Sequence, residues 1–314
     1  MPAIRNFDGT WELRGENGDD ATLDKYHPAY KEALPRYLTA LDHAFFAAKE
    51  KCEFEFLLTM FRVRGIDNRG IGDAYETTLR AIPLLYEVHD RTESFEAARH
   101  LQLWIYGHIV EASEPYEILS NLVNVALGER FSSQFYPYKV GKSRPQSPSS
   151  KIKHIEELSV KADMLDVVTP LKEIWDRNLR NAIFHSDYIL HGGFVHTQDR
   201  IYSHDEIMTI VNRAIVYHES LANLYNLYIH QYSAPTIIPT HPDFSHGRAE
   251  SAVVIVRQGH GAVGLKDAWT KEELAKGKIN WRIGIFTKEE LSLLNRNPEL
   301  AILPQRHEEA DPIQ

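Results

Sequence analysis

The most informative stretch of the sequence reads Leu179-Arg180-Asn181-Ala182-Ile183-Phe184-His185-Ser186-Asp187-Tyr188. It closes a predicted helix that starts at Pro170, because Thr169 before a proline is typical of a helix N-cap followed by the first helical position. Apolar residues then recur every three or four positions and form one stripe: Leu171, Ile174, Trp175, Leu179, Ala182 and Ile183. We therefore expect one amphipathic helix from Pro170 to the end of this stretch, with its apolar side in a helical core.

Three side chains near the end of this predicted helix suit phosphodiester chemistry. Asn181 and His185 are four residues apart, so the amide lies on the same helix face as the imidazole and can orient it. Arg180 lies about 140° from His185 around the helix, so the two share a ligand only if Arg180 folds round or meets a His185 of a second subunit. A guanidinium binds phosphate oxygens and an imidazole moves protons. In RNA the ribose 2'-OH supplies the nucleophile, and this chemistry requires no metal.

The spacing of Arg180 and His185 is weak evidence by itself, because the chain contains 16 histidines and chance alone produces such pairs. Arg213 and His218 have the same spacing. His218, however, falls on the apolar stripe of another predicted helix. We interpret this second pair as structural, with His218 in the core or at an interface.

The complete string, Arg180-Asn181-Ala182 followed by His185 on an amphipathic helix, resembles the HEPN superfamily. In that superfamily an arginine, usually followed by a polar residue, is separated from a histidine by four to six residues. The resemblance covers roughly residues 150–232. It implies a small helical bundle that dimerises so that two motifs form one cleft. It also implies that Arg180 contacts phosphate, that His185 acts as general base or acid, and that Asn181 orients His185.

Many members of the superfamily are metal-independent endoribonucleases without a cofactor, which leave 2',3'-cyclic phosphate ends and act as toxins, antiphage effectors or RNA-processing enzymes. Others are non-catalytic modules that bind RNA or protein. The resemblance thus implies RNA as substrate, a homodimer, and a cognate antitoxin or regulatory protein as a partner. One departure concerns Tyr188, which stands three residues after His185 instead of two, so its modification by a nucleotidyltransferase partner is not expected. A binding-only module and a purely structural helix end remain the alternatives.

Composition limits the kind of RNA site that the chain can have. The formal net charge of -9 argues against a surface that coats long stretches of nucleic acid, so an RNA site has to be local. We expect five basic residues, in or next to a Pro/Ser-rich loop, to border it: Lys139, Lys142, Arg144, Lys151 and Lys153. The same charges are equally typical of a solvated loop.

The single cysteine, Cys52, excludes an intramolecular disulfide and a cysteine-based zinc site, and it suggests a reducing compartment. No apolar run approaches the roughly 20 residues of a membrane span, and the first eight residues lack the regions of a signal peptide. We expect a cytoplasmic protein without membrane attachment. The histidine clusters lack the spacing of zinc ligands, so no metal site is expected.

The predicted fold class is mainly α, with a HEPN-like helical bundle and a smaller C-terminal α+β appendage. Helices are expected over residues 28–64 (one long or two joined), 73–110 (kinked at Pro83), from Ser113 to Gly128, and after the capping box of Ser203 and Glu206. The expected regions are an N-terminal arm (1–25), a helical region (26–135), the basic loop (136–150), the HEPN-like core helices (151–235), a small α+β region (236–302) and a disordered tail (303–314).

Short strands are expected over residues 10–13, 252–256 and 279–286. The sequence from Gly259 to Gly264 formally matches a dinucleotide-binding GxGxxG, but no helix opens directly after it, so we interpret it as a tight turn between strands. Two similar capping patterns, at 269–274 and 286–291, predict two short helix starts.

Overall fold

The computed structural model describes residues 2–15, 17–61, 74–132, 147–234, 236–240, 251–257, 261–267, 282–284 and 307–309. The chain forms two compact units. The first contains Met1–Cys52 and Ala74–Asn226, and the second contains Glu53–Asp73 and Leu227–Gln314. The described part of the chain is mainly helical with a few small sheets, which confirms the mainly α class. The division between the units places residues 53–73 with the C-terminal part, which no local feature of the sequence indicates.

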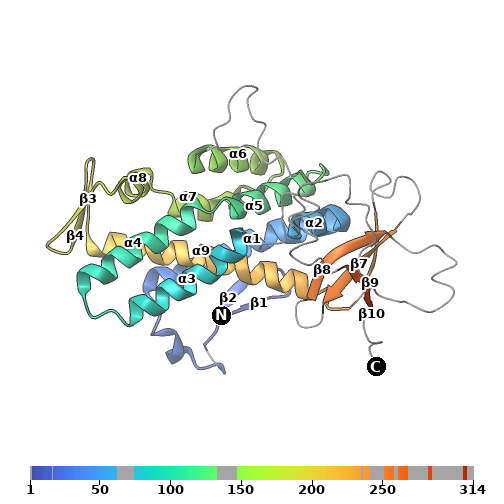
Figure 1. Ribbon diagram of the computed structural model, residues 1–314, viewed down its shortest axis with the longest axis horizontal. Coiled ribbons are helices and arrows are strands. Elements are labelled where there is room, and N and C mark those ends of the chain that lie inside the picture. Colours follow the sequence, from blue (N-terminus) through green and yellow to red (C-terminus); the bar gives the residue numbers. More distant parts are fainter. Residues whose placement is uncertain are drawn as a thin grey trace. The chain divides into compact units, whose positions relative to one another are not determined.

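Helices build the first unit (Figure 1). Helix α1 packs along α5, α3 packs along α4, and α5 packs along α6. Large side chains that are fully buried fill the space between them, among them Tyr37, Phe45, Tyr106, Tyr116 and Tyr217. The helices are α1 (Pro28–Lys51), α3 (Ala74–Asp90), α4 (Phe95–Glu111), α5 (Ser113–Ala126), α6 (Pro148–Lys161), α7 (Thr169–Ile174), α8 (Arg177–His185) and α9 (His204–His230), with 3-10 turns at η1 (Asp20–Leu23) and η3 (Leu165–Val168).

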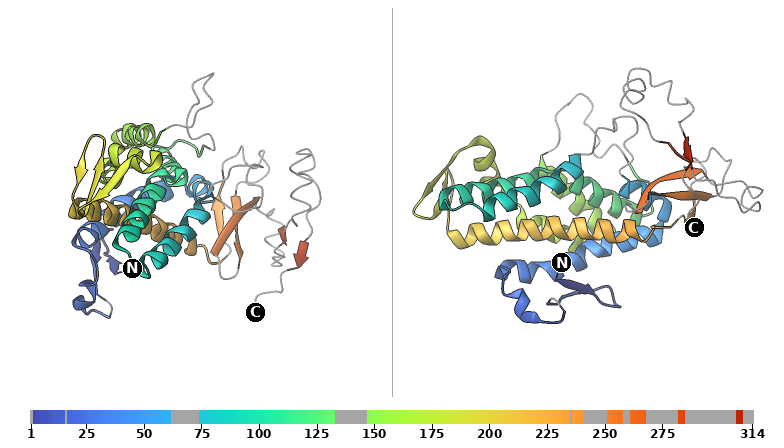
Figure 2. Two further views of the ribbon diagram at one scale, coloured as in Figure 1. Left: turned by 60° about the vertical axis from the view of Figure 1, so that its left-hand side comes forward. Right: turned by 60° about the horizontal axis from the view of Figure 1, so that its bottom comes forward.

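The N-terminal arm is held against α1 (Figure 2). Strands β1 (Ala3–Arg5) and β2 (Trp11–Leu13) pair antiparallel, in agreement with the strand expected over residues 10–13. Asp42 of α1 is buried and accepts hydrogen bonds from Arg5 Nε at 2.5 Å and Trp11 Nε1 at 2.9 Å. A buried carboxylate needs such donors, and here the arm supplies them.

Two helical predictions need correction or refinement. The region 28–64 contains two helices, α1 and α2 (Glu53–Met60), which are separated at Cys52 by one residue with extended backbone. The region 73–110 is not one helix kinked at Pro83. It consists of α3 and α4, and Pro83 lies inside α3. The break comes at residues 91–94 because Ser94 caps α4 by accepting a hydrogen bond from the backbone N–H of Ala97.

The helix predicted from Pro170 onward is also divided. Thr169 has helical backbone angles and is the first residue of α7, so it is not the N-cap. Helix α7 ends before Trp175, and Asp176 starts α8 as a true N-cap. The Asp176 carboxylate accepts hydrogen bonds from the backbone N–H groups of Asn178 at 2.9 Å and Leu179 at 3.0 Å.

Residues distant in the sequence hold this break in place. The Tyr106 hydroxyl of α4 donates to the carbonyl of Ile174 at 3.0 Å and accepts from the backbone N–H of Asp176 at 3.1 Å. The Tyr202 hydroxyl donates to Asp176 Oδ1 at 2.9 Å, and Arg200 Nη1 lies 3.7 Å from Asp176 Oδ2. The start of α8 is therefore fixed by tertiary contacts as well as by its own cap.

Gly107 allows α8 to lie close to α4. A Cβ atom at this position would stand 3.3 Å from Ile183 Cγ2 and 3.3 Å from Phe184 Cε2. Such contacts are tighter than ordinary packing, so a larger residue would push the helices apart.

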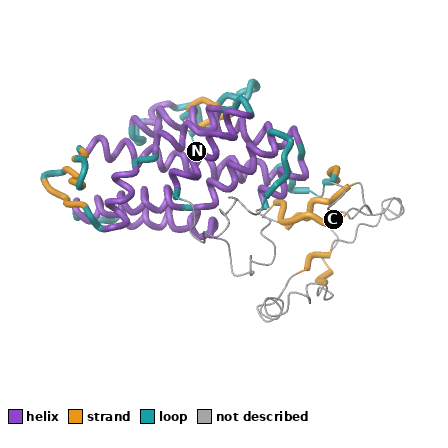
Figure 3. The backbone as a smooth tube through the Cα atoms, turned by 90° about the horizontal axis from the view of Figure 1, so that it is seen from above, coloured by secondary structure: helices purple, strands orange, loops and turns teal. Residues whose placement is uncertain are grey.

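A small antiparallel sheet follows α8, and the sequence did not predict it. Its strands are β3 (Tyr188–His191), β4 (Phe194–Thr197) and β5 (Ile201–Tyr202), joined in that order. Gly192 and Gly193, both with positive φ, make the turn between β3 and β4. The sheet lies at the end of the helices where α4 and α9 begin (Figure 3). The expected capping box opens α9, with Ser203 N–H donating to Glu206 Oε2 at 2.8 Å and Glu206 N–H donating to Ser203 Oγ at 3.3 Å.

The second unit combines α2 with short strands. Strands β6 (Ile237–Pro239), β7 (Ser251–Arg257) and β8 (Gly261–Asp267) form one antiparallel sheet, which confirms the strand expected over residues 252–256. Gly261 and Gly264 of the glycine pattern lie in strand β8, so they do not open a helix as a dinucleotide site requires, and Gly259 lies outside the described residues. Strands β9 (Arg282–Gly284) and β10 (His307–Glu309) pair with each other, so the tail expected to be disordered over 303–314 forms a strand at His307–Glu309. The two capping patterns lie outside the described residues.

Removing the N-cap of α8 should destabilise the fold. The substitution Asp176→Ala deletes the cap and leaves the Tyr202 hydroxyl without its acceptor. We expect a loss of about 1–3 kcal/mol in the free energy of unfolding, measured by urea denaturation. Asp199→Ala, at an exposed position next to β5, is the matched control and should change stability by less than about 0.5 kcal/mol. Equal stability of the two variants would contradict the role of Asp176.

Candidate functional site

Arg180 is held in a fixed position on α8. Its Nε donates to Glu111 Oε1 at 2.5 Å, its Nη1 donates to Asn181 Oδ1 at 3.0 Å, and its guanidinium carbon lies 5.1 Å from the centre of the Phe184 ring. The side chain is 25% exposed. Within the described parts of the chain Nη2 makes no hydrogen bond, so this nitrogen is left to bind an oxygen atom of a ligand.

Asn181 does not orient His185 as the sequence suggested. Its side-chain oxygen accepts the hydrogen bond from Arg180, and the described residues show no hydrogen bond between Asn181 and His185. The amide oxygen is engaged by a guanidinium, which is a charged and therefore strong donor. Asn181 is therefore a residue that positions Arg180.

His185 is exposed and is the last residue of α8. Ser186 follows in the left-handed conformation, with φ 54°, and ends the helix. The five-residue separation places His185 about 7.5 Å along the helix axis from Arg180 and about 140° around it. The two residues thus start from different sides of α8, and the hydrogen bond from Arg180 to Asn181 turns the guanidinium toward the face that carries His185. The shared cleft between two copies stays a prediction.

Two further residues of this region come from α4 and were missed by sequence reasoning. Glu111 pairs with Arg180, and His100 Nδ1 lies 2.6 Å from the hydroxyl of Tyr188, three residues after His185. Burial raises the pKa of Tyr188. No local pattern marks either residue, since both contacts join positions far apart in the sequence. The one available clue is Gly107, because a glycine inside a predicted helix indicates close approach of another element.

The basic residues expected beside the site have different surroundings. Lys139, Lys142 and Arg144 lie outside the described residues. Lys151 is only 6% exposed, and its Nζ donates to Ser113 Oγ at 2.6 Å and lies 5.3 Å from the centre of the Tyr116 ring. The prediction that Lys151 binds RNA is therefore wrong, because α6 packs on α5 through the helix face that carries this lysine.

Lys153 belongs to the opposite kind of environment. Its side chain is 77% exposed, and its Nζ lies 3.9 Å from Glu157 Oε1 one helical turn further on. Such a pair on an exposed helix contributes little to stability. Of the five predicted cations, Lys153 is the one for which the described structure shows an exposed charge.

Arg213 and His218 have separate packing roles. Arg213 Nη2 donates to Glu32 at 3.1 Å, and Arg213 Nη1 lies 3.9 Å from Glu173. His218 is 6% exposed, in agreement with the structural interpretation of this pair. Burial lowers the pKa of His218 to about 4, and His108 nearby lowers it as well.

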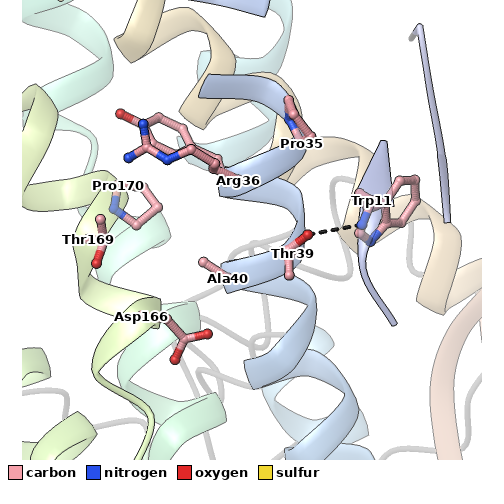
Figure 4. Close-up of a pocket in the computed structure, with 9 residues that line it drawn as sticks. Trp11, Pro35, Arg36, Thr39, Ala40, Asp166, Thr169 and Pro170 are labelled. Carbon is pink, nitrogen blue, oxygen red and sulfur yellow. Dashed lines mark hydrogen bonds between the residues drawn. The ribbon is translucent and has the colours of Figure 1, made fainter. Parts of the chain in front are cut away.

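A pocket of about 340 Å³ lies between α1, β2 and the segment η3–α7 (Figure 4). Trp11, Thr39 and Pro170 are among its lining residues. Its arginine, Arg36, is engaged by Glu32 and Glu173. These carboxylates neutralise the charge of Arg36. The carboxylate of Asp166, which also lines the pocket, lies 3.1 Å from His43 Nδ1.

Two features are absent from the described residues. These residues contain no group of three or more His, Cys, Asp or Glu side chains that is arranged to hold a metal ion. Within the same parts of the chain, no helix combines the length and the apolar character that crossing a bilayer requires.

Comparisons of the chain with protein-family models, with curated proteins and with solved structures found no match. The resemblance to the HEPN superfamily accordingly stays a prediction that rests on Arg180, Asn181 and His185. What the fold and the site define is a mainly helical protein in which one short helix presents a fixed arginine and an exposed histidine.

The burial of His218 predicts a specific dependence of stability on pH. The unfolded histidine titrates near 6.5, whereas the folded one titrates near 4, so the unfolded chain binds more protons between these values. The lowered pKa of His218 therefore contributes up to about 3 kcal/mol to the free energy of unfolding. This stabilisation is fully present above pH 6.5 and is lost as the pH falls toward 4. Urea denaturation at several pH values measures it.

Two variants isolate this contribution from that of other groups. Both His218→Leu and His218→Gln remove the titrating imidazole, so both should flatten the pH dependence between 6.5 and 4, whatever their absolute stabilities. An unchanged slope in both variants would show that His218 is not the group responsible.

Proposed function

We propose that the chain is a metal-independent endoribonuclease that uses Arg180 and His185 of α8. The observation that carries this proposal is the position of Arg180, which Glu111 and Asn181 hold while its Nη2 is left for a ligand oxygen. His185 stands exposed on the same short helix. The two groups supply charge stabilisation and proton transfer, which are the two requirements of RNA cleavage by its own 2'-OH.

In the proposed reaction the ribose 2'-oxygen attacks the adjacent phosphorus. The new bond to the 2'-oxygen forms as the bond to the 5'-oxygen of the next nucleotide breaks. His185 accepts the proton of the 2'-OH while water protonates the leaving 5'-oxygen, or it donates a proton to the 5'-oxygen while water takes that of the 2'-OH. Arg180 stabilises the charge on the non-bridging oxygens. The products carry a 2',3'-cyclic phosphate and a 5'-OH. DNA, which lacks the 2'-OH, is not cleaved.

A second copy of the chain completes the proposed site. Arg180 and His185 of one chain stand about 7.5 Å apart along the helix and about 140° apart around it, which favours a site shared between two copies. In a dimer the arginine of one copy and the histidine of the other meet the same group. A regulatory protein or antitoxin then acts by covering this cleft.

The second candidate is a non-catalytic module that binds RNA or a partner protein. The contact between Arg180 and Glu111 favours it, because the carboxylate neutralises the charge that a phosphate would need. The two candidates differ in what Glu111 does. In the nuclease it aligns Arg180 and is partly displaced by RNA, whereas in the module it keeps the arginine in a structural ion pair.

RNA cleavage in excess EDTA distinguishes these candidates. Wild-type protein should produce 2',3'-cyclic phosphate ends on a labelled oligoribonucleotide and leave the matching DNA intact. His185→Ala should lower the rate by about 100-fold or more with the fold retained. Arg180→Ala should lower it comparably, because the phosphate loses its cation.

Arg213→Ala is the matched control, because Arg213 contacts Glu32 and Glu173 on another face of the bundle. It should cleave at the wild-type rate. Intact RNA in every reaction with a folded dimer would favour the binding module, and loss of activity in Arg213→Ala with retention in His185→Ala would refute the choice of site.

A further inference from the structure

A second pocket, of about 150 Å³, lies between the start of α4 and the turn that joins β3 to β4. Arg99 lines it from α4, and Gly192 and Gly193 line it from the turn. The pocket is separate from Arg180, because Arg99 and Glu111 are twelve residues apart on α4, or about 18 Å along the helix axis.

Arg99 is an unusual residue for a protein interior. It is only 3% exposed, and its Nη1 is buried without a hydrogen-bond partner. In the described parts of the chain no carboxylate lies within ion-pair distance of Arg99, and its Nη2 donates to the neutral Nδ1 of His204 instead. A buried guanidinium without a counter-charge is costly, since neither water nor an anion compensates its desolvation.

The surroundings of Arg99 indicate what kind of anion would compensate this charge. The ring of Phe95 lies 5.4 Å from the guanidinium carbon yet is 60% exposed, and Phe194 on the opposite wall is 45% exposed. Exposed aromatic rings at the mouth of a pocket are surfaces on which another ring stacks. A Cβ atom at Gly193 would meet nothing within 4 Å, so the turn leaves the mouth open.

We propose that this pocket binds a small aromatic phosphate ester of the nucleoside monophosphate type. Its phosphate enters beside Arg99, where the unpartnered Nη1 donates to a phosphate oxygen while Nη2 stays with His204. Its ring lies on Phe194 at the rim, because Phe95 already stacks on the ring of His204. The volume of the pocket agrees with a phosphate inside and a ring at the rim. About 150 Å³ is less than a complete drug-sized ligand needs, but it suits the phosphate with part of the sugar.

One acidic residue, Glu96, also lines the pocket. Its side chain is exposed, so water screens its repulsion of a bound phosphate. The proposal concerns binding at Arg99 and does not require the ribonuclease activity proposed for Arg180 and His185. Its test therefore uses binding measurements on the intact chain.

Isothermal titration and thermal unfolding in the presence of AMP, adenosine, inorganic phosphate and acetate test the proposal at constant ionic strength. Wild-type protein should bind AMP saturably, and AMP should raise its Tm. It should bind inorganic phosphate more weakly than AMP, and adenosine and acetate most weakly of all. Arg99→Met should fold, because it replaces a buried charge by an apolar side chain of similar length, and should lose at least about tenfold in AMP affinity.

Two control variants locate the effect. Arg91→Met removes an arginine that is 77% exposed and should bind AMP as wild type does. Arg180→Met measures how much of the AMP binding belongs to the candidate nuclease site. If Arg99→Met does not fold, Arg99→Lys, which keeps the charge without the fork, should still weaken AMP binding. Unsaturable binding by wild type, full binding by both Arg99 variants, or loss of binding only in Arg180→Met would overturn the assignment of this pocket.

Discussion

The contact of Tyr106 with the chain break at Asp176 is the constraint on which the candidate site depends. One hydroxyl satisfies the last carbonyl of α7 and the backbone N–H at the start of α8. Without it, the break would bury two polar backbone groups that lack partners. By holding the break, Tyr106 sets the direction in which α8 leaves the core, and with it the positions of Arg180 and His185.

Helix α4 connects the functional features of the first unit. Its first turns carry Arg99 and His100, Gly107 lets α8 approach, and Glu111 at its end holds Arg180. The two proposed sites are thus parts of one rigid element. A change in the position of α4 therefore alters the surroundings of both sites.

Much of the helical fold follows from local patterns in the sequence. Residues that act within one turn, such as Ser203 and Glu206 or the apolar stripe of α8, were predicted correctly because their partners are close in the chain. The division of α7 from α8 was missed because the apolar stripe runs through it and Tyr106, which fixes it, lies 70 residues away. Arg180, Asn181 and His185 were identified from their chemistry, but the preference of Asn181 for Arg180 depends on side-chain geometry that spacing does not encode.

The shortness of α8 has a consequence for the order in which the site is assembled. A helix of nine residues is not stable by itself in water, so α8 forms only against α4 and after Tyr202 has reached Asp176. Tyr202 lies beyond the helix that it stabilises. A chain still emerging from the ribosome therefore lacks the contact that holds the start of α8 until the β3–β5 sheet has also emerged. The candidate site is completed only after the helices from α1 to α7 have been made.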